Sequence, residues 1–259
     1  MDGALTPMNM SPGLLRVAVR ARREPDAQFH SVAHLIDVEA LERAFHRQRR
    51  DAAAGVDGVT KEEYGRGLEA NLRDLHGRLK TMRYRHQPIR RVHIPKDKGG
   101  TRPLGISAFE DKIVQDALRE VLQAVYEQDF LDCSYGFRPG RRAHDAIRAF
   151  LRAAERGEAN WVLEADIKSF FDSVDRNTLL ELLRIRVPDG SIKRLVARMS
   201  GSTGRIVPYR TWESVCTWAC LRARSYPDPR RARPRGRCCR PCWRTSISTT
   251  RWTSGSSGR

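Results

Sequence analysis

The stretch WVLEADIKSFFDSVD (residues 161–175) decides the interpretation of this chain. Residues 161–167 have the composition of a strand that carries Asp166 to the edge of a sheet. A carboxylate placed there can bind Mg²⁺, which prefers oxygen ligands and takes one or two carboxylates plus substrate phosphates. Phe171 follows as a flat wall against which a sugar ring can press. The structural alternative is that Asp166 caps a turn while Phe170 and Phe171 pack in the core.

Helices and strands alternate irregularly around this stretch, which predicts a mixed α/β or α+β fold. Apolar spacing predicts a helix from Leu35 that ends at Gly55, and a second helix with a leucine stripe over 68–79. Two strands, over 89–95 and 101–106, flank a Gly-Gly turn. Three further helices are expected: one burying Ile113, Ala117, Val121 and Val125, one burying Ala143, Ile147, Phe150 and Leu151, and one that Asp175 caps.

The charge of the chain is large and unevenly distributed. The formal net charge is +17 over 259 residues, which favours a polyanionic partner such as nucleic acid. Residues 216–259 hold eleven Arg, no Lys and one acid, a net of +10, so the first 215 residues carry 17 − 10 = +7. No apolar run approaches the ~20 residues of a membrane span, and no secretory pattern precedes the first helix. We therefore expect a soluble, cytoplasmic protein with no membrane partner.

The loop IPKDKGGTRPL (residues 94–104) has two cations around a glycine pair. Lys96 and Arg102 can face one way because Gly99 and Gly100 let the backbone bend closely. Such a hairpin suits a triphosphate, since a guanidinium can grip two phosphate oxygens. The alternative is a solvated basic turn.

A second basic loop is YGFRPGRR (residues 135–142). Arg138, Arg141 and Arg142 are interleaved with Tyr135 and Phe137, a mixture that fits a sugar–phosphate backbone and an unstacked base. The sequence therefore predicts RNA binding by these three arginines. A surface loop whose aromatic side chains pack inward is the equal alternative.

Five stretches, in this order, resemble the reverse transcriptases encoded by bacterial group II introns, also called intron maturases. They lie within residues 35–199 and together are specific, although none is so alone. The stretches are AAGVDGVT (53–60), IPKDKGGTRPLGI (94–106), EDKIVQDALREVL (110–122), SYGFRPGRRAHDAI (134–147) and WVLEADIKSFFDSVD (161–175).

The resemblance implies a role for each matching residue. Asp166 would be the first metal-binding aspartate of a polymerase palm, and the carbonyl of Ile167 a second ligand of the same Mg²⁺. Phe171 would block a ribose 2′-hydroxyl and so select deoxynucleotides. Lys96 and Arg102 would hold the incoming dNTP. The implied fold is α+β, with the fingers and part of the palm of a right-hand polymerase.

The resemblance fails after residue 199. The family carries a paired Asp-Asp and, before it, a Gln-Gly segment running into Ser-Pro, but this sequence contains no Asp-Asp. A GC-rich coding of residues 232–248, read two bases later, gives Thr-Pro-Gln-Gly-Ala-Val-Leu-Ser-Pro-Val-Leu-Ala-Asn-Ile-Tyr-Leu, which is the missing segment. We therefore expect a frameshift between residues 200 and 215 and a disordered tail beyond it. The alternative is a zinc module of Cys216, Cys220, Cys239 and Cys242.

These inferences predict four regions: a flexible segment (1–30), a helical RNA-binding and fingers region (31–85), reverse transcriptase fingers and partial palm (86–199), and the frameshifted tail (200–259). The parent would be an RNA-directed DNA polymerase that copies group II intron RNA from a DNA primer or target and assists intron splicing. For this chain, which lacks the later aspartates, we expect no catalysis. The alternative function is a non-catalytic module that binds intron RNA.

Overall fold

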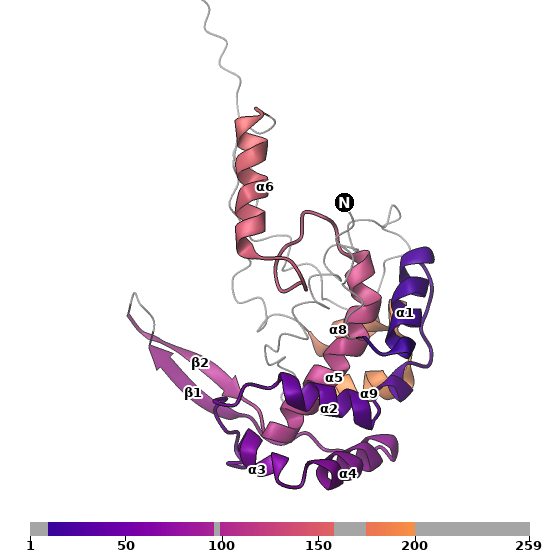
Figure 1. The fold of residues 1–259 in the computed structure, drawn as a ribbon, viewed down its shortest axis with the longest axis vertical. Helices are drawn as coiled ribbons and strands as arrows, with labels where there is room; N and C mark the ends of the chain where they lie inside the picture. The colour runs from indigo at the N-terminus through magenta and orange to yellow at the C-terminus, as the bar shows by residue number, and fades with distance from the viewer. Residues whose placement is uncertain (1–9, 96–98, 158–174, 200–259) are drawn as a thin grey trace, which may run out of the picture.

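Helix α5 (Phe109–Tyr126) is the element around which the others are arranged (Figure 1). The structure is a computed structural model that describes residues 10–95, 99–157 and 175–199. Thirteen of the eighteen residues of α5 are buried, and the predicted repeat of Ile113, Ala117, Val121 and Val125 is confirmed as core. A helix buried on nearly every side needs neighbours on nearly every side.

The described elements form a mixed fold of helices and one small antiparallel sheet, as the interleaved sequence pattern predicts. Within the described ranges no helix is long and apolar enough to cross a membrane. Besides α5, the elements in chain order are α1 (Pro12–Arg23), η2 (Ala33–Leu35), α2 (Val38–Arg47), α3 (Lys61–Gly65), α4 (Leu68–Lys80), β1 (Arg90–Pro95), β2 (Thr101–Ile106), η3 (Glu127–Asp129), α6 (Ala143–Glu155), α8 (Arg176–Arg186) and α9 (Gly190–Met199).

Helices α1 and α2 both pack against α5, and α4 covers α2. The leucine stripe of α4 is confirmed, with Leu72 and Leu75 buried and Leu68 and Leu79 packed at the edge of the core. The predicted cap of α8 is also confirmed, because the Asp175 carboxylate accepts a hydrogen bond from the backbone N–H of Thr178 at 2.9 Å.

Residues 12–23 form helix α1, although we placed them in a flexible N-terminal segment. Leu14, Ala18 and Ala21 are buried on one side of α1. The Ser11 hydroxyl accepts a hydrogen bond from the N–H of Leu14, and Pro12 occupies the first turn, where a missing N–H is harmless. Two of the three buried positions are alanines and the helix is rich in arginine, so the amino-acid composition does not indicate that α1 contributes to the core.

Helix α2 ends at Arg47 rather than at Gly55, where the glycine signal placed it. The Lys61 ammonium donates hydrogen bonds to the carbonyls of His46 and Gln48, at 3.1 and 2.5 Å, and so satisfies the end of the helix from outside. Gly55 serves another purpose. A Cβ there would lie 2.5 Å from the Cα of Ala108, so the glycine allows two backbones to touch.

Two elements project from the helical body (Figure 1). The hairpin of β1 and β2 has the predicted strands, paired so that Val92 faces Leu104 and Arg91 faces Gly105. Helix α6 is also in its predicted place, but its burial was predicted wrongly. Ala143, Ile147, Phe150 and Leu151 are exposed, because none of the described elements covers the apolar side of α6.

A buried arginine joins the first and last described parts of the chain. Arg186, at the end of α8, is 0% exposed and pairs with the Asp129 carboxylate through two N–H groups at 2.9 and 3.0 Å. It also donates to the carbonyl of Ala27 at 2.5 Å, while its guanidinium lies 5.7 Å from the centre of the Phe29 ring. One side chain thus holds the loop after α1, the turn after α5 and α8 together.

We expect Arg186→Met to destabilise the fold by about 3–5 kcal/mol, because the substitution removes the Arg186 guanidinium from the buried Asp129 carboxylate and from the backbone carbonyls that it binds. Urea denaturation followed by circular dichroism measures the loss. Arg184→Met, at an exposed position of the same helix, is the matched control and should leave the transition in place. Equal midpoints for the two variants would contradict the role assigned to Arg186.

Candidate nucleic-acid interface

The hairpin supplies the first predicted site, the pair of Lys96 and Arg102. Arg102 lies in β2, paired across the sheet with Ile94, and Lys96 lies outside the described residues. Gly99 and Gly100 have φ of +85° and +82°, a backbone conformation that favours glycine, so the predicted tight turn is confirmed at these two positions. The proposed grip on a triphosphate stays a prediction.

The predicted metal site lies between α6 and α8 in the chain. Asp166, Ile167 and Phe171 all fall in residues 158–174, outside the described ranges. Among the residues that are described, no group of three or more His, Cys, Asp or Glu side chains could hold a metal ion. The ligands that the resemblance implies for Mg²⁺ are the Asp166 carboxylate and the Ile167 carbonyl, which make only a partial ligand set.

The second basic loop is described in full, and its three arginines have different surroundings. Arg138 is buried: its guanidinium pairs with Glu127 at 2.8 Å and donates to the carbonyls of Leu131 and Ser134 at 2.8 and 2.9 Å. It also lies 5.0 Å from the centre of the Phe130 ring. All of these contacts are internal, so Arg138 holds the loop in shape and offers little charge to a ligand.

Arg141 and Arg142 lie further along the same loop. Arg141 pairs with the exposed Asp132 carboxylate at 2.9 Å and lies 5.4 Å from the centre of the Tyr135 ring. Arg142 is exposed and precedes α6, with its backbone N–H bonded to the Asp145 carboxylate at 2.9 Å. Phe137 is 68% exposed and has a φ of +56°. The loop therefore presents Arg142 and an aromatic ring to solvent, an arrangement that suits a nucleic acid.

Burial raises the pKa of the Glu127 carboxyl, and the hydrogen bonds from Arg138 oppose that rise. Desolvation and the ion pair with Arg138 thus act on the pKa of this carboxyl in opposite directions, and desolvation is the larger effect. Sequence reasoning placed Arg138 at the surface because Gly and Pro surround it. The sequence signal that could have indicated a buried ion pair was Glu127, an acid directly after the apolar helix over 109–126.

Sequence reasoning also missed a buried polar centre beneath the hairpin. The Asp111 carboxylate accepts hydrogen bonds from the Tyr84 hydroxyl and from the backbone N–H of Gln87, and lies 3.7 Å from the His86 ring. Burial raises the pKa of Asp111 against these favourable contacts. This centre ties the chain before β1 to α5, so it fixes the base from which the hairpin projects.

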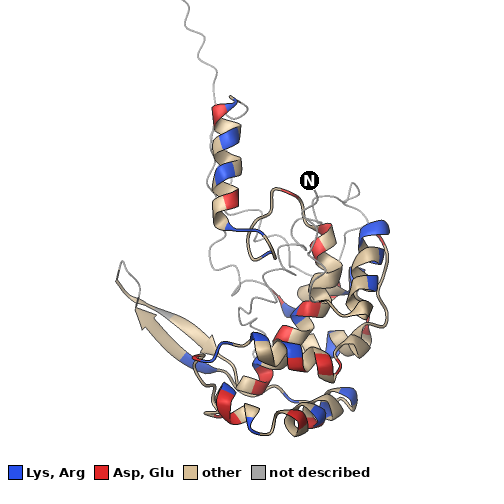
Figure 2. Cartoon of the chain, viewed as in Figure 1, with Lys and Arg blue, Asp and Glu red and all other residues tan. Residues whose placement is uncertain are grey.

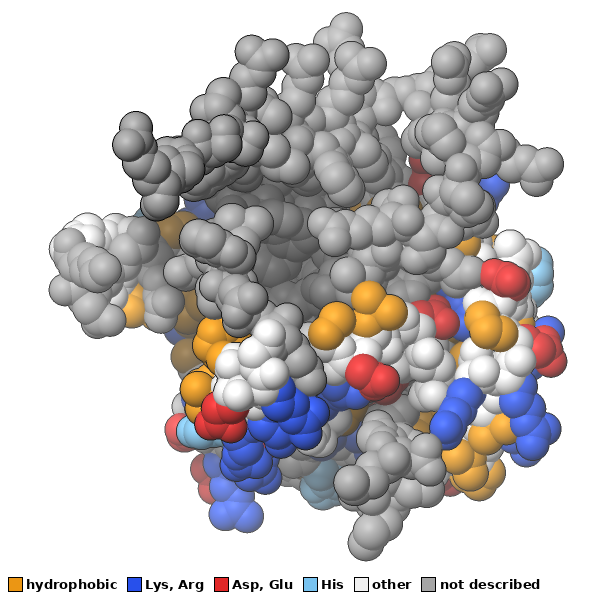
Figure 3. All heavy atoms as spheres, turned by 90° about the horizontal axis from the view of Figure 1, so that it is seen from above, with side chains coloured by type: hydrophobic (Ala, Val, Ile, Leu, Met, Phe, Trp, Pro, Cys, Tyr) orange, Lys and Arg blue, Asp and Glu red, His pale blue; other side chains and the backbone are white. Residues whose placement is uncertain are grey.

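Basic, acidic and apolar side chains are interspersed over the described part of the face seen in Figure 3. Figure 2 shows basic positions along α1, all of them arginines, and no acid in the helix. Surface charge of this kind attracts a polyanion in a salt-dependent way but carries no sequence information.

We expect Arg138→Met to lower stability and to make the loss depend on pH. Without Arg138 the pKa of Glu127 rises further, so the folded state binds a proton more readily than the unfolded state. Stability should then be greatest at low pH and fall as pH rises through the folded-state pKa. Melting temperatures at several pH values between 4.5 and 8 measure the slope.

Arg142→Met is the matched control in the same loop, because its side chain is exposed. This variant should melt like the parent chain at every pH. A pH-independent loss in Arg138→Met, or an equal loss in Arg142→Met, would contradict the pairing of Glu127 with Arg138.

Comparison with known proteins finds similarity to reverse transcriptases and intron-encoded proteins. Residues 94–215 match the family described as reverse transcriptase (RNA-dependent DNA polymerase). The chain is 41% identical over 145 residues to protein YkfC of Escherichia coli K12, an alignment that covers 55% of this chain and 38% of that protein. It is 35% identical over 154 residues to the group II intron-encoded protein LtrA of Lactococcus lactis, covering 59% of this chain and 25% of LtrA.

More distant similarity reaches the nuclear intron maturase 1 of Arabidopsis thaliana, with 32% identity over 88 residues, 34% of this chain and 12% of that protein. The chain therefore spans well under half the length of each of these relatives. The match to the reverse transcriptase family contains every residue that the sequence predicted for nucleotide, metal and RNA binding.

Proposed function

From a chain that carries a reverse transcriptase domain and is homologous to group II intron-encoded proteins, we infer that residues 86–199 are the fingers and part of the palm of an RNA-directed DNA polymerase. The observation that carries this proposal is the order of the motifs. Lys96, Arg102, Asp166, Ile167 and Phe171 all lie within residues 94–215, the stretch that matches the reverse transcriptase family.

Each residue has one task in the proposed reaction. Lys96 and Arg102 bind the phosphates of a dNTP, and Phe171 excludes a ribose 2′-hydroxyl from the sugar site. Asp166 and the carbonyl of Ile167 would hold Mg²⁺, which when bound stabilises charge on phosphate oxygens during phosphoryl transfer. The template is RNA, with the intron RNA as the proposed partner and DNA as the primer or target.

The printed chain is proposed to lack this catalysis, because a second and third carboxylate would be needed beside Asp166 and no Asp-Asp occurs in it. The family match ends at residue 215, the limit that we set for the frameshift. Residues 216–259 contain five of the six cysteines and a net charge of +10, a composition unlike that of the first 215 residues. We propose that the tail is read in a shifted frame.

Primer extension on an RNA template tests the proposal. The printed chain should give no DNA product above that of Asp166→Asn. A chain whose residues after the shift are replaced by the alternative reading should synthesise DNA, and Asp166→Asn should bring that synthesis to background.

Two outcomes would overturn parts of this account. Asp166-dependent synthesis by the printed chain would show that the later carboxylates are not required. A gene sequence in which no frame after codon 195 encodes Gln-Gly and paired aspartates would remove the frameshift while leaving the reverse transcriptase domain in place.

A further inference from the structure

A hollow that contains none of the predicted site residues lies between three segments far apart in the sequence. We call it the α4–α9 groove. Its walls are the loop over residues 30–37, residues 76–84 at and after the end of α4, and residues 189–198 at the start of α9. Its volume is about 680 Å³, large enough for a nucleotide.

Two side chains fix the walls of the groove. The Asp189 carboxylate accepts hydrogen bonds from the N–H groups of Val32 and Ala33, at 2.7 and 2.9 Å, and from the N–H of Ser191 at 2.8 Å. Arg198 donates to the carbonyl of Tyr84 at 2.8 Å, after the turn that follows α4. The groove is therefore held open by bonds between its own walls.

The acids of the groove are already satisfied by backbone. Asp189 is 5% exposed and is surrounded by N–H donors, and Asp37 caps α2 by accepting from the N–H of Ala40 at 2.7 Å. Both carboxylates keep their negative charge, but their oxygens are bound to backbone N–H groups of the protein, so the ligand contacts have to come from other side chains.

Apart from Ser31, Ser191 and Tyr84, the remaining polar side chains of the groove are Lys, Arg and His. Lys80 and Arg194 are exposed, and three histidines line the same hollow: His30, His34 and His76. Within the described part of the chain, Lys80 and these histidines have no hydrogen bond or ion pair. Arg194 bonds only one N–H, to the carbonyl of Gly190 at 3.1 Å, which leaves donors for a ligand.

The floor of the groove is apolar, formed by Ile36, Leu79, Ile192 and Leu195. A phosphate alone needs no such floor, whereas a nucleotide has a base and a sugar to place there. The groove thus combines cations at its rim with an apolar base, in a space closed on three sides.

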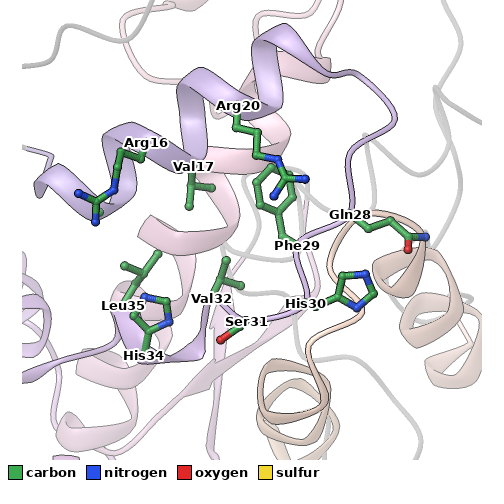
Figure 4. A pocket seen from close by; sticks show the side chains of 11 residues that line it. Arg16, Val17, Arg20, Gln28, Phe29, His30, Ser31, Val32, His34 and Leu35 are labelled. Carbon is green, nitrogen blue, oxygen red and sulfur yellow. The ribbon is translucent and has the colours of Figure 1, made fainter.

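A neighbouring pocket of about 440 Å³ extends this surface (Figure 4). His30, Ser31 and His34 line both hollows. Figure 4 shows Arg16 and Arg20 projecting from α1 across from these residues, with Arg20 lying 5.5 Å from the centre of the buried Phe29 ring. A ligand longer than one nucleotide would meet cations on both sides of the His30–His34 loop.

We propose that the α4–α9 groove binds the sugar–phosphate backbone of single-stranded RNA, with Lys80 and Arg194 contacting phosphates. The inference rests on the proposed function for the choice of RNA as the polyanion. The basic rim, the satisfied acids and the apolar floor place the contact in this groove rather than on the surface at large.

The test compares full-length chains in binding to a fluorescent single-stranded RNA of twenty nucleotides. Lys80→Glu with Arg194→Glu should weaken binding by at least about tenfold at 150 mM salt. The slope of log Kd against log salt should fall by about 1.4, which is two phosphate contacts at about 0.7 each on a single strand. Lys80→Gln with Arg194→Gln should give a smaller loss of RNA affinity. This double variant replaces the charge reversal in the test if the charge reversal unfolds the chain.

Arg66→Glu with Arg184→Glu is the matched control, since both positions are exposed, lie outside the groove and change the net charge by the same amount. Equal loss of affinity and of salt slope in the two pairs would overturn the proposal. So would parent-like binding by a folded groove variant.

The Arg142→Glu variant distinguishes failure of the groove proposal from failure of the proposed function. RNA binding that depends on Arg142 but not on the groove would reject the groove and leave the proposed function standing. A parent chain that does not bind the RNA at all would reject both.

Discussion

The pairing of Arg186 with Asp129 is the interaction on which the described fold depends most. A guanidinium with 0% exposure is stable only if its donors are all directed at acceptors, and here the acceptors come from the end of α1, the loop after it and the turn after α5. Removing either charge leaves the other buried. The further hydrogen bonds of Arg186 to the carbonyls of Ala21 and Ala27 join segments more than 150 residues apart. The Asp189 carboxylate, three residues later, binds the N–H of Val32 and so joins the start of α9 to the loop over 30–37.

Much of this arrangement could be predicted from apolar spacing. The repeat in α5, the leucine stripe of α4 and the two strands of the hairpin each follow from a period that only one kind of element has. Apolar spacing does not show which element packs against a predicted helix or strand. Helix α6 has a clear apolar side, yet Ile147, at 56% exposed, shows that an amphipathic pattern predicts a helix without predicting what covers it.

The end of α2 and the surroundings of Arg138 share a physical cause, which is that polar side chains hold the structure together through contacts that the local sequence does not show. Helix α2 ends at Arg47 because Lys61 binds its last carbonyls, and Gly55 is needed for a close approach to Ala108 instead of a cap. The same cause applies to Arg138 in the candidate site. A basic residue in a loop rich in Gly and Pro suggests a surface ligand, but the guanidinium of Arg138 is bonded to Glu127 and two carbonyls.

Net charge is for this reason a poor guide to where a polyanion binds. Residues 216–259, with their eleven arginines, carry a larger net charge than the rest of the chain. Charge of this density attracts any nucleic acid. A positioned site needs cations that no internal acid has claimed and a surface on which a base can lie. Lys80 and Arg194 meet the first condition and the floor beside Leu79 and Leu195 meets the second, whereas Arg138 fails the first. The structure therefore adds to the sequence which cations are paired with an acid of the protein and which are available to a ligand; their number alone does not show this.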